Sequence, residues 1–198
     1  MSFELIVATT NREKFVEISD YLKLDGLKLV PLFELPDAPE IEETGFTFLE
    51  NATLKAETIY KLYKKPVFAD DTGLCVDYLN GMPGVFSARF AGPDATYEQN
   101  RKKLMKLLEG VPFNRRRAYF VTQIVFFDPD GRRHTIEGRV NGFITEKERG
   151  SGIFGYDPVF LYPPMGRTFA ELPVRIKNRV SHRGRALSVL KEMLKQWL

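Results

Sequence analysis

The first seventy residues alternate between short apolar runs and stretches with a single apolar face. Residues 5–8 are short, continuous and apolar, which predicts a buried strand; residues 27–30 predict a second short strand, and the apolar run from Val67 predicts a third that ends at Asp70. The intervals between them carry apolar residues at helical spacing, which predicts two amphipathic helices. The order of strand, helix, strand, helix and strand favours parallel pairing with right-handed crossovers. The predicted apolar faces are Phe15, Ile18 and Leu22 in the first helix, and Leu49, Ala52, Ala56, Ile59 and Tyr63 in the second.

Three predicted helices begin with the pattern of a capping box, in which a Thr side chain and a Glu or Gln three residues later bond each other's backbone N–H groups. The pairs are Thr10 with Glu13, Thr47 with Glu50, and Thr96 with Gln99. We therefore expect helices directly after Thr10, Thr47 and Thr96.

Longer strands dominate the middle of the chain. Residues 118–127 and 134–144 are rich in β-branched and aromatic side chains, and the turn sequence DPDG at 128–131 separates them. These two strands are expected to pair in antiparallel fashion. A short strand at 158–161 and a C-terminal helix around 187–197 follow, so the whole pattern predicts one α/β unit with a mixed sheet.

Composition and charge narrow the choice of partner and location. The 198 residues are 43% hydrophobic, enough for a substantial core, and the net charge of +3 does not by itself indicate nucleic acid. The charge is uneven, because residues 34–50 contain no Lys or Arg, whereas basic residues dominate from Arg167 onward. The single cysteine, Cys75, excludes an internal disulfide. No apolar run approaches the roughly 18 residues of a membrane span, so we expect a cytoplasmic protein without a membrane partner.

Two adjacent carboxylates follow the third predicted strand. Asp70 and Asp71 are expected where this strand ends, at the rim of the sheet, where clefts form in α/β folds. Adjacent carboxylates repel each other unless a cation, a basic side chain or water compensates, and Mg²⁺ is the natural candidate. Glu42 and Glu43 could join them around one ion. The alternative is a polar turn beside a solvated acidic loop.

The segment from Thr9 to Lys14 is a candidate phosphate site. It lies between a predicted strand and a helix start, where backbone N–H groups and the helix dipole favour an anion. It lacks the glycine-rich run of a Walker loop, although its Thr, Asn, Arg and Lys side chains all donate hydrogen bonds. The alternative is a well-capped helix with Arg12 and Lys14 exposed.

Two further segments suit a nucleobase. The glycines of residues 150–158 permit close backbone approach to a ligand, while Phe154 and Tyr156 offer faces for stacking and Asp157 can accept from a ring N–H. Before the last helix, His182 and Arg183 could donate to a base oxygen or to a phosphate. The alternatives are a tight turn with its aromatic rings in the core, and a solvated basic helix entry.

Six segments in this order resemble the inosine triphosphate pyrophosphatases (dITP/XTP pyrophosphatases), a family that clears non-standard purine nucleotides. The resemblance extends from Phe3 nearly to the C-terminus. Thr10 and Ile153 occupy positions where the family often has Gly. The matching segments are TTNREK at 9–14, EETG at 42–45 with ENA at 50–52, ADDTGL at 69–74, GMPGVFSAR at 81–89, FGYDP at 154–158 and SHRG at 181–184.

The resemblance implies an α/β fold with an elongated mixed sheet flanked by helices, two lobes around a central cleft, and a single domain over residues 1–198. It implies a homodimer and a Mg²⁺-dependent enzyme that cleaves ITP, dITP or XTP between the α and β phosphates, releasing pyrophosphate. Asp71 matches the general base and, with Glu42, the metal ligands. Substrate contacts match Thr9, Thr10, Asn11, Arg12, Glu13 and Lys14 for the triphosphate, and also Thr72, Phe154, Gly155, Tyr156, Asp157, Lys177, His182 and Arg183.

Base selection would follow from hydrogen-bond polarity. Hypoxanthine and xanthine present an oxygen at position 6 and an N–H at position 1, which suit donors such as His182 or Arg183 and the acceptor Asp157. Two other functions stay open. One is a pyrophosphatase for other bases, such as modified pyrimidines. The other is a non-catalytic nucleotide or nucleic-acid binder that uses the basic C-terminal third, although Asp70 and Asp71 would repel phosphate without a metal.

Overall fold

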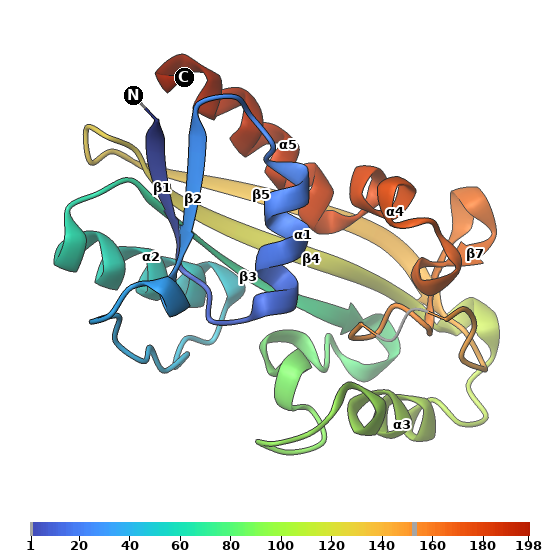
Figure 1. The fold of residues 1–198 in the computed structure, drawn as a ribbon. Helices are drawn as coiled ribbons and strands as arrows, with labels where there is room; N and C mark the ends of the chain where they lie inside the picture. Colours follow the sequence, from blue (N-terminus) through green and yellow to red (C-terminus); the bar gives the residue numbers. More distant parts are fainter. Residues whose placement is uncertain (1, 152–153) are drawn as a thin grey trace. The chain divides into compact units, whose positions relative to one another are not determined.

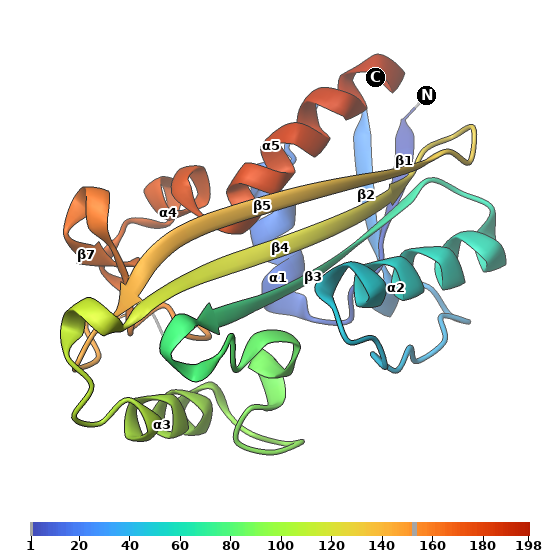
Figure 2. The same ribbon diagram turned by 180° about the vertical axis from the view of Figure 1, so that it is seen from behind.

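The computed structural model describes residues 2–151 and 154–198. Their strands form one mixed sheet in the order β2-β1-β3-β4-β5-β6-β7, with helices beside it, so the expected α/β fold class is confirmed (Figures 1 and 2). The strands are β1 Phe3–Val7, β2 Leu27–Pro31, β3 Val67–Val76, β4 Arg117–Phe127, β5 Arg133–Ile144, β6 Phe160–Tyr162 and β7 Arg167–Thr168. The α-helices are α1 Arg12–Tyr21, α2 Phe48–Tyr63, α3 Tyr97–Leu107, α4 Val174–Val180 and α5 His182–Leu194.

The direction of pairing changes across the sheet. β1 pairs in parallel with β2, where Phe3 faces Leu27, and with β3, where Ile6 faces Val67, as the strand–helix alternation predicted. β4 and β5 are neighbours joined by the turn that begins at Asp128, so they form the expected antiparallel hairpin. β5, β6 and β7 are antiparallel to their neighbours.

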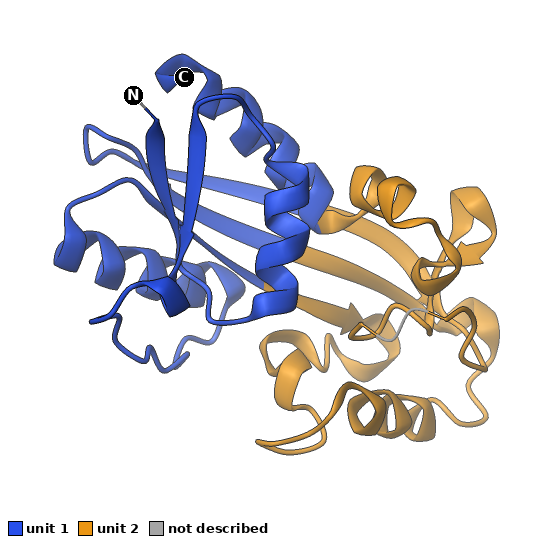
Figure 3. Ribbon diagram, viewed as in Figure 1, with its two compact units in different colours: residues 1–71, 122–138, 183–198 blue, residues 72–121, 139–182 orange. Residues whose placement is uncertain are grey.

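The chain forms two compact units, each built from separated segments (Figure 3). The first unit contains residues 1–71, 122–138 and 183–198, and the second contains residues 72–121 and 139–182. Strands β3, β4 and β5 each contribute residues to both units. None of the helices in the described parts of the chain is long and apolar enough to cross a membrane.

In the first unit, α1 and α5 cover one face of the strands and α2 covers the other (Figures 1 and 2). Val7 packs in one apolar cluster with Ile18 of α1 and Leu187 of α5. Its neighbour Ile6 belongs to a second cluster with Ala56 of α2. Because successive strand residues point to opposite faces and both faces are covered, β1 appears in the sequence as a continuous apolar run.

The second unit has a core of its own. Leu104 of α3 packs there with Phe120 of β4, Phe160 of β6 and Phe169. The ring centroids of Phe120 and Phe160 are 4.6 Å apart, and those of Phe160 and Phe169 are 4.9 Å apart. The short strands β6 and β7 can form few hydrogen bonds with their neighbours, so packing in this aromatic cluster holds them in place.

Two of the three predicted capping boxes are confirmed. Thr47 and Thr96 cap α2 and α3, with Glu50 and Gln99 completing the reciprocal bonds. The box at Thr10 is wrong, because the Asn11 side chain caps α1 by accepting from the Lys14 N–H at 2.8 Å. Asn and Thr both suit the N-cap position, so the pattern alone does not fix which of two neighbours takes it.

Other differences lie at short elements. β6 begins at Phe160 instead of 158, while α4 and β7 have no counterpart among the predicted elements. Leu49, predicted on the buried stripe of α2, is 37% exposed. The buried face of α2 instead includes the polar residues Asn51 and Lys55.

Candidate active site

The expected strand end at Asp70 is wrong, because β3 continues through Asp70 and Asp71 to Val76. Both carboxylates are buried, at 3% and 7% exposure. Phe68 lies in the cluster with α1 and α5, and Ala69 in the cluster with α2. Strand alternation therefore directs Asp70 toward α1 and α5, and Asp71 toward α2. The two carboxylates have different partners.

Asp70 is held by two cations of the first unit. Its Oδ1 lies 3.3 Å from Lys14 Nζ of α1, and its Oδ2 lies 3.5 Å from Arg183 Nε of α5. Arg183 also pairs through Nη1 with Glu17 of α1. Burial acts to raise the pKa of Asp70, but the charges of Lys14, Arg183 and Lys55 outweigh it and hold the pKa well below its usual range. Asp70 is therefore a fixed negative charge.

Asp71 is held from the other side. The Asn51 side chain of α2 donates from Nδ2 to Asp71 Oδ2 at 3.0 Å. Burial raises the pKa of Asp71 above its ordinary value and the Glu43 charge adds to this, although Lys55 and Asn51 act in the opposite direction. A carboxyl group with a raised pKa is suited to accept a proton during a reaction.

Lys55 connects these groups. Its Nζ donates to Glu43 Oε1 at 2.5 Å and to the backbone oxygen of Asp70 at 2.8 Å. Burial lowers the pKa of Lys55, but the charges of Asp71, Glu43 and Asp70 outweigh it and raise the pKa. Lys55 is therefore a buried, charged ammonium among carboxylates, a position in which it can also attract an anion.

A cavity of about 230 Å³ opens beside this cluster within the first unit. Its lining includes Thr9, Thr10, Asn11, Lys14, Glu43 and Lys55. The segment that precedes α1 and two cationic side chains thus face one space. Helix N-termini and buried ammonium groups both favour anions, so the cavity suits phosphate.

The predicted phosphate segment is divided between buried and exposed side chains. Thr9 is buried, and its hydroxyl accepts from the Asn11 N–H at 3.2 Å. Thr10, Arg12 and Glu13 are exposed, and the Arg12 guanidinium lies over the Phe33 ring at 4.3 Å. Direct roles for these three side chains stay predictions.

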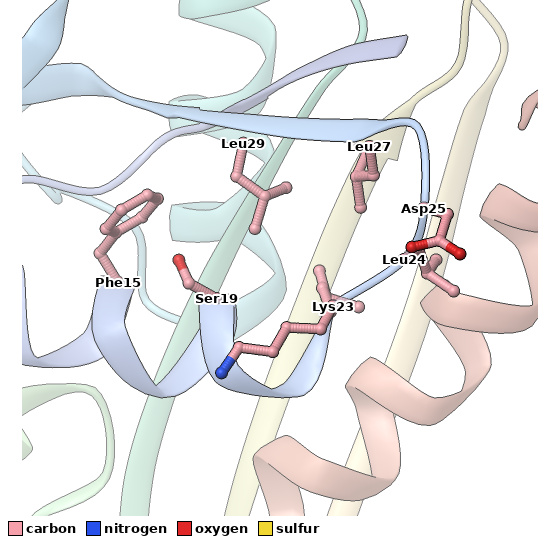
Figure 4. Close-up of a pocket in the computed structure, with 8 residues that line it drawn as sticks. Phe15, Ser19, Lys23, Leu24, Asp25, Leu27 and Leu29 are labelled. Atoms are coloured by element: carbon pink, nitrogen blue, oxygen red, sulfur yellow. The ribbon is translucent and has the colours of Figure 1, made fainter. Parts of the chain in front are cut away.

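A larger cavity of about 420 Å³ in the same unit has different chemistry (Figure 4). It lies between α1 and β2 and is lined mainly by apolar side chains such as Phe15, Leu27 and Leu29. Lys23 and Asp25 also line it, and the Ser19 hydroxyl is buried without a hydrogen-bond partner among the described residues. Volume alone therefore does not identify the site, because the lysines Lys14 and Lys55 and the acidic Glu43 line the smaller cavity.

The remaining predicted contacts belong to the second unit. Lys177 Nζ pairs with Asp157 Oδ2 at 2.6 Å and lies over the Phe154 ring at 5.0 Å. The backbone oxygen of Gly155 accepts from Arg101 Nη1 at 2.9 Å. These contacts place Lys177 of α4 against an acid and a half-buried ring of the turn at 154–157. Gly152 and Ile153, which precede this turn, lie outside the described residues.

Tyr156 and His182 are both buried. Tyr156 is 5% exposed, packs in the core and donates its hydroxyl to the Ser87 backbone oxygen at 2.9 Å. His182 stacks on Phe120 with ring centroids 4.6 Å apart. Thr72 is half-buried. Contacts of these residues with a base stay predictions.

His182 and Arg183 are consecutive residues of different units. His182 belongs to the second unit, while Arg183 contacts Asp70 and Glu17 of the first. The structure therefore places Arg183 with the carboxylates Asp70 and Glu17, and its role in base recognition stays a prediction.

Of the two acidic residues in the loop before α2, Glu43 pairs with Lys55, whereas Glu42 is exposed. The described residues contain no group of three or more His, Cys, Asp or Glu side chains that could enclose a metal ion. Asp71 and Glu43 supply hard oxygen atoms without forming a complete cage. Such a donor set fits Mg²⁺, which binds one or two protein carboxylates and completes its shell with water and substrate phosphate.

Three members of the cluster were not among the predicted site residues, namely Asn51, Lys55 and Glu17. Asn51 and Lys55 are four residues apart on the buried face of α2, so a polar pair at helical spacing within an apolar stripe was the available signal. Glu17 lies about one turn after Lys14 on α1, so these two charged side chains are also neighbours on their helix. Its partner Arg183 is 166 residues away in the sequence, so no local pattern could reveal the pair.

Known proteins identify the family. The Ham1 family model matches residues 5–193. The dITP/XTP pyrophosphatase of Geobacter sulfurreducens is 48% identical over 192 residues, which covers 96% of each chain. That of Geobacillus kaustophilus is 45% identical and covers 98% of this chain and 94% of the relative.

Solved structures agree with this result. The HAM1 protein of Coxiella burnetii superposes with a TM-score of 0.88 at 38% identity and covers 98% of this chain and 99% of that one. The Ham1 protein of Staphylococcus aureus has a TM-score of 0.88 at 37% identity and covers 98% and 100%. The resemblance expected from the six sequence segments is confirmed, and the chain belongs to the Ham1 family.

Proposed function

We propose that this protein is a nucleoside triphosphate pyrophosphatase that hydrolyses non-canonical purine nucleotides, dITP, XTP and ITP, to the monophosphate and pyrophosphate. One observation carries the proposal: Asp71, buried and with a raised pKa, lies in the same cluster as Lys55, which lines a cavity at the N-terminus of α1. The names of the relatives support the choice of substrate class.

The chain's own residues account for the steps of hydrolysis. Lys14 and Lys55 attract the phosphates by charge, and the N–H groups at the start of α1 donate to phosphate oxygen. Asp71 orients a water molecule toward the α-phosphorus and accepts its proton. Asp70 keeps Lys14 in place through their ion pair. The buried ammonium groups then stabilise the charge that develops on the departing pyrophosphate.

We propose Mg²⁺ as the cofactor, held by Asp71 and by an acidic residue of the loop before α2. When bound, the ion would neutralise phosphate charge and fix the orientation of the phosphate chain. Glu42 is the ligand implied by the family resemblance, whereas Glu43 is the residue paired with Lys55. The variants Glu42→Gln and Glu43→Gln distinguish them, because loss of a ligand raises the Mg²⁺ concentration needed for half-maximal rate. Dependence unchanged in both variants would contradict a ligand role for this loop.

The base is proposed to contact the second unit, where Asp157 and His182 supply an acceptor and a donor. His182→Ala should lower the ratio of kcat/KM for ITP to that for ATP by about tenfold, since the position 6 oxygen loses a donor. An equal proportional loss on both nucleotides would remove His182 from base recognition. We also propose that the protein works as a cytoplasmic homodimer, and light scattering during size-exclusion chromatography would measure the oligomeric state.

Pyrophosphate release from a panel of nucleotides tests the proposal. We expect turnover of dITP, XTP and ITP that requires Mg²⁺ and exceeds that of ATP, GTP and dUTP. Asp71→Asn should lower kcat by 100-fold or more without unfolding the protein, because a general base contributes about 10²-fold or more. Preferred turnover of dUTP would favour a pyrimidine enzyme. Nucleotide binding without pyrophosphate release would favour a non-catalytic binder.

A further inference from the structure

Asn51 links the loop before α2 to Asp71. Its side chain is fully buried, at 0% exposure. Its Oδ1 accepts from the Gly45 N–H at 2.8 Å, and its Nδ2 donates to Asp71 Oδ2 at 3.0 Å. A backbone N–H can only donate, so the amide oxygen of Asn51 must face Gly45 and the amide nitrogen must face Asp71. The two bonds together leave one orientation for the amide.

The neighbouring residue of α2, Glu50, fastens the same loop. Glu50 Oε2 accepts from the N–H groups of Phe46 and Thr47 at 2.7 and 3.0 Å. Three consecutive amides, from Gly45 to Thr47, are therefore bonded to two adjacent side chains of α2. A Cβ atom on Gly45 would lie 2.7 Å from Asn51 Oδ1, so the close approach requires glycine.

We propose that Asn51 is the positioning residue for Asp71: it fixes the rotation of the Asp71 carboxylate and holds it in register with the acidic loop at Glu42–Gly45. This inference rests on the proposed function, because it assigns the orientation of the group that accepts the proton. Asn51 itself touches neither phosphate nor water in the reaction. Its loss should act on kcat, whereas Lys14 and Lys55 still bind the triphosphate.

The chain contains a matched control in α3. Asn100 also follows a capping box directly and is also buried, at 2% exposure. Its Oδ1 accepts from the Ala91 N–H at 2.7 Å, and its Nδ2 donates to the Ala88 backbone oxygen at 2.8 Å. Each asparagine accepts from a backbone N–H of the preceding loop, but Asn51 donates to the ionisable side chain of Asp71, whereas Asn100 donates to a backbone oxygen. Asn100 variants therefore measure the structural cost alone.

The test compares Asn51→Ala and Asn51→Asp with Asn100→Ala and Asn100→Asp. Aspartate keeps the acceptor for Gly45 but places a carboxylate oxygen against Asp71 and removes the donor. Supporting groups around a reactive carboxylate are typically worth 10- to 100-fold, and small displacements of a reacting group have similar effects. We expect both Asn51 variants to lower kcat for dITP by 10- to 100-fold with KM within about threefold of wild type. The Asn100 variants should stay within about threefold of wild type in both constants.

The Tm of all four variants is measured alongside the kinetics. If the Asn51 variants fail to fold, Gly45→Ala replaces them, because its Cβ displaces the Asn51 amide without removing it. Gly45→Ala should likewise lower kcat while KM changes less. The role of Asn51 is overturned if its variants lose no more kcat than the Asn100 variants at equal loss of Tm, or if the loss lies in KM. If the wild type is active and either of these results is found, only the positioning role of Asn51 is refuted. A wild type that releases no pyrophosphate refutes both the proposed function and this inference.

Discussion

Arg183→Ala should destabilise the protein strongly, because Arg183 is the cation shared by two carboxylates in a buried network. The Arg183 and Asp70 side chains are 4% and 2% exposed, and Glu17 is 16% exposed. Removing one partner of a buried ion pair typically costs about 3–5 kcal/mol, since a charge stays buried without its compensation. For a chain of this size about 1 kcal/mol shifts Tm by about 2–4 °C, so Tm should fall by roughly 6–20 °C.

Differential scanning calorimetry of Arg183→Ala against Arg185→Ala measures this loss. Arg185 is exposed on the same helix, and its replacement should change Tm by only a degree or two. The double variant Glu17→Gln, Arg183→Met should recover part of the loss, because it removes the Glu17 charge that Arg183→Ala leaves without its partner, while Asp70 keeps its ion pair with Lys14. A Tm for Arg183→Ala within about 2 °C of that for Arg185→Ala would refute the network as a source of stability.

Gly131→Ala should destabilise the β4–β5 turn, since Gly131 has φ of +78° and an added Cβ would lie 2.3 Å from Tyr60 Oη. Adding Tyr60→Phe to this variant should restore part of the lost Tm. An unchanged Tm in Gly131→Ala would contradict the contact. Burial acts to raise the pKa of Asp128, but bonds from the His134 ring and from two backbone N–H groups lower it, so its stabilising effect is present above the unfolded pKa near 4 and is lost as pH falls through the lower folded value. The Tm difference between wild type and Asp128→Asn should therefore narrow as the pH falls below about 4, and a difference that widens there would reverse the sign. Lys14→Ala should raise KM about equally for ITP and GTP, which share the triphosphate, and a changed preference between them would place Lys14 near the base.

The elements that the sequence predicted well are those whose partners are close along the chain. The parallel strands β1 and β2, the capping boxes at Thr47 and Thr96, and the hairpin at Asp128 all depend on local spacing or turn chemistry. Short elements such as α4 carry too few residues for a periodic pattern, and they form because the surrounding fold packs them.

The site shows the opposite behaviour. Asp70 and Asp71 were recognised as chemically important, but their adjacency was taken to end the strand. The strand continues because cations from distant segments compensate the charge, and Arg183 is 113 residues away from Asp70. Lys55 was overlooked because a lysine beside an apolar stripe is usually exposed. Here Lys55 is buried, and the charges of nearby carboxylates compensate its own. Such non-local compensation cannot be deduced from spacing.

Successive side chains of β3 point to opposite faces of the sheet, which separates the carboxylates of Asp70 and Asp71 and reduces their repulsion. Two adjacent carboxylates on one face would compete for the same cations, and one would be protonated. On opposite faces each has its own environment. Asp70, paired with Lys14 and Arg183, stays charged and stabilises the position of Lys14. Asp71, next to Asn51 and influenced by Glu43, has a raised pKa. A strand that passes through the dipeptide can therefore hold a structural charge and a proton acceptor at neighbouring positions, whereas a strand ending before it would leave both carboxylates in a solvated turn with similar pKa values.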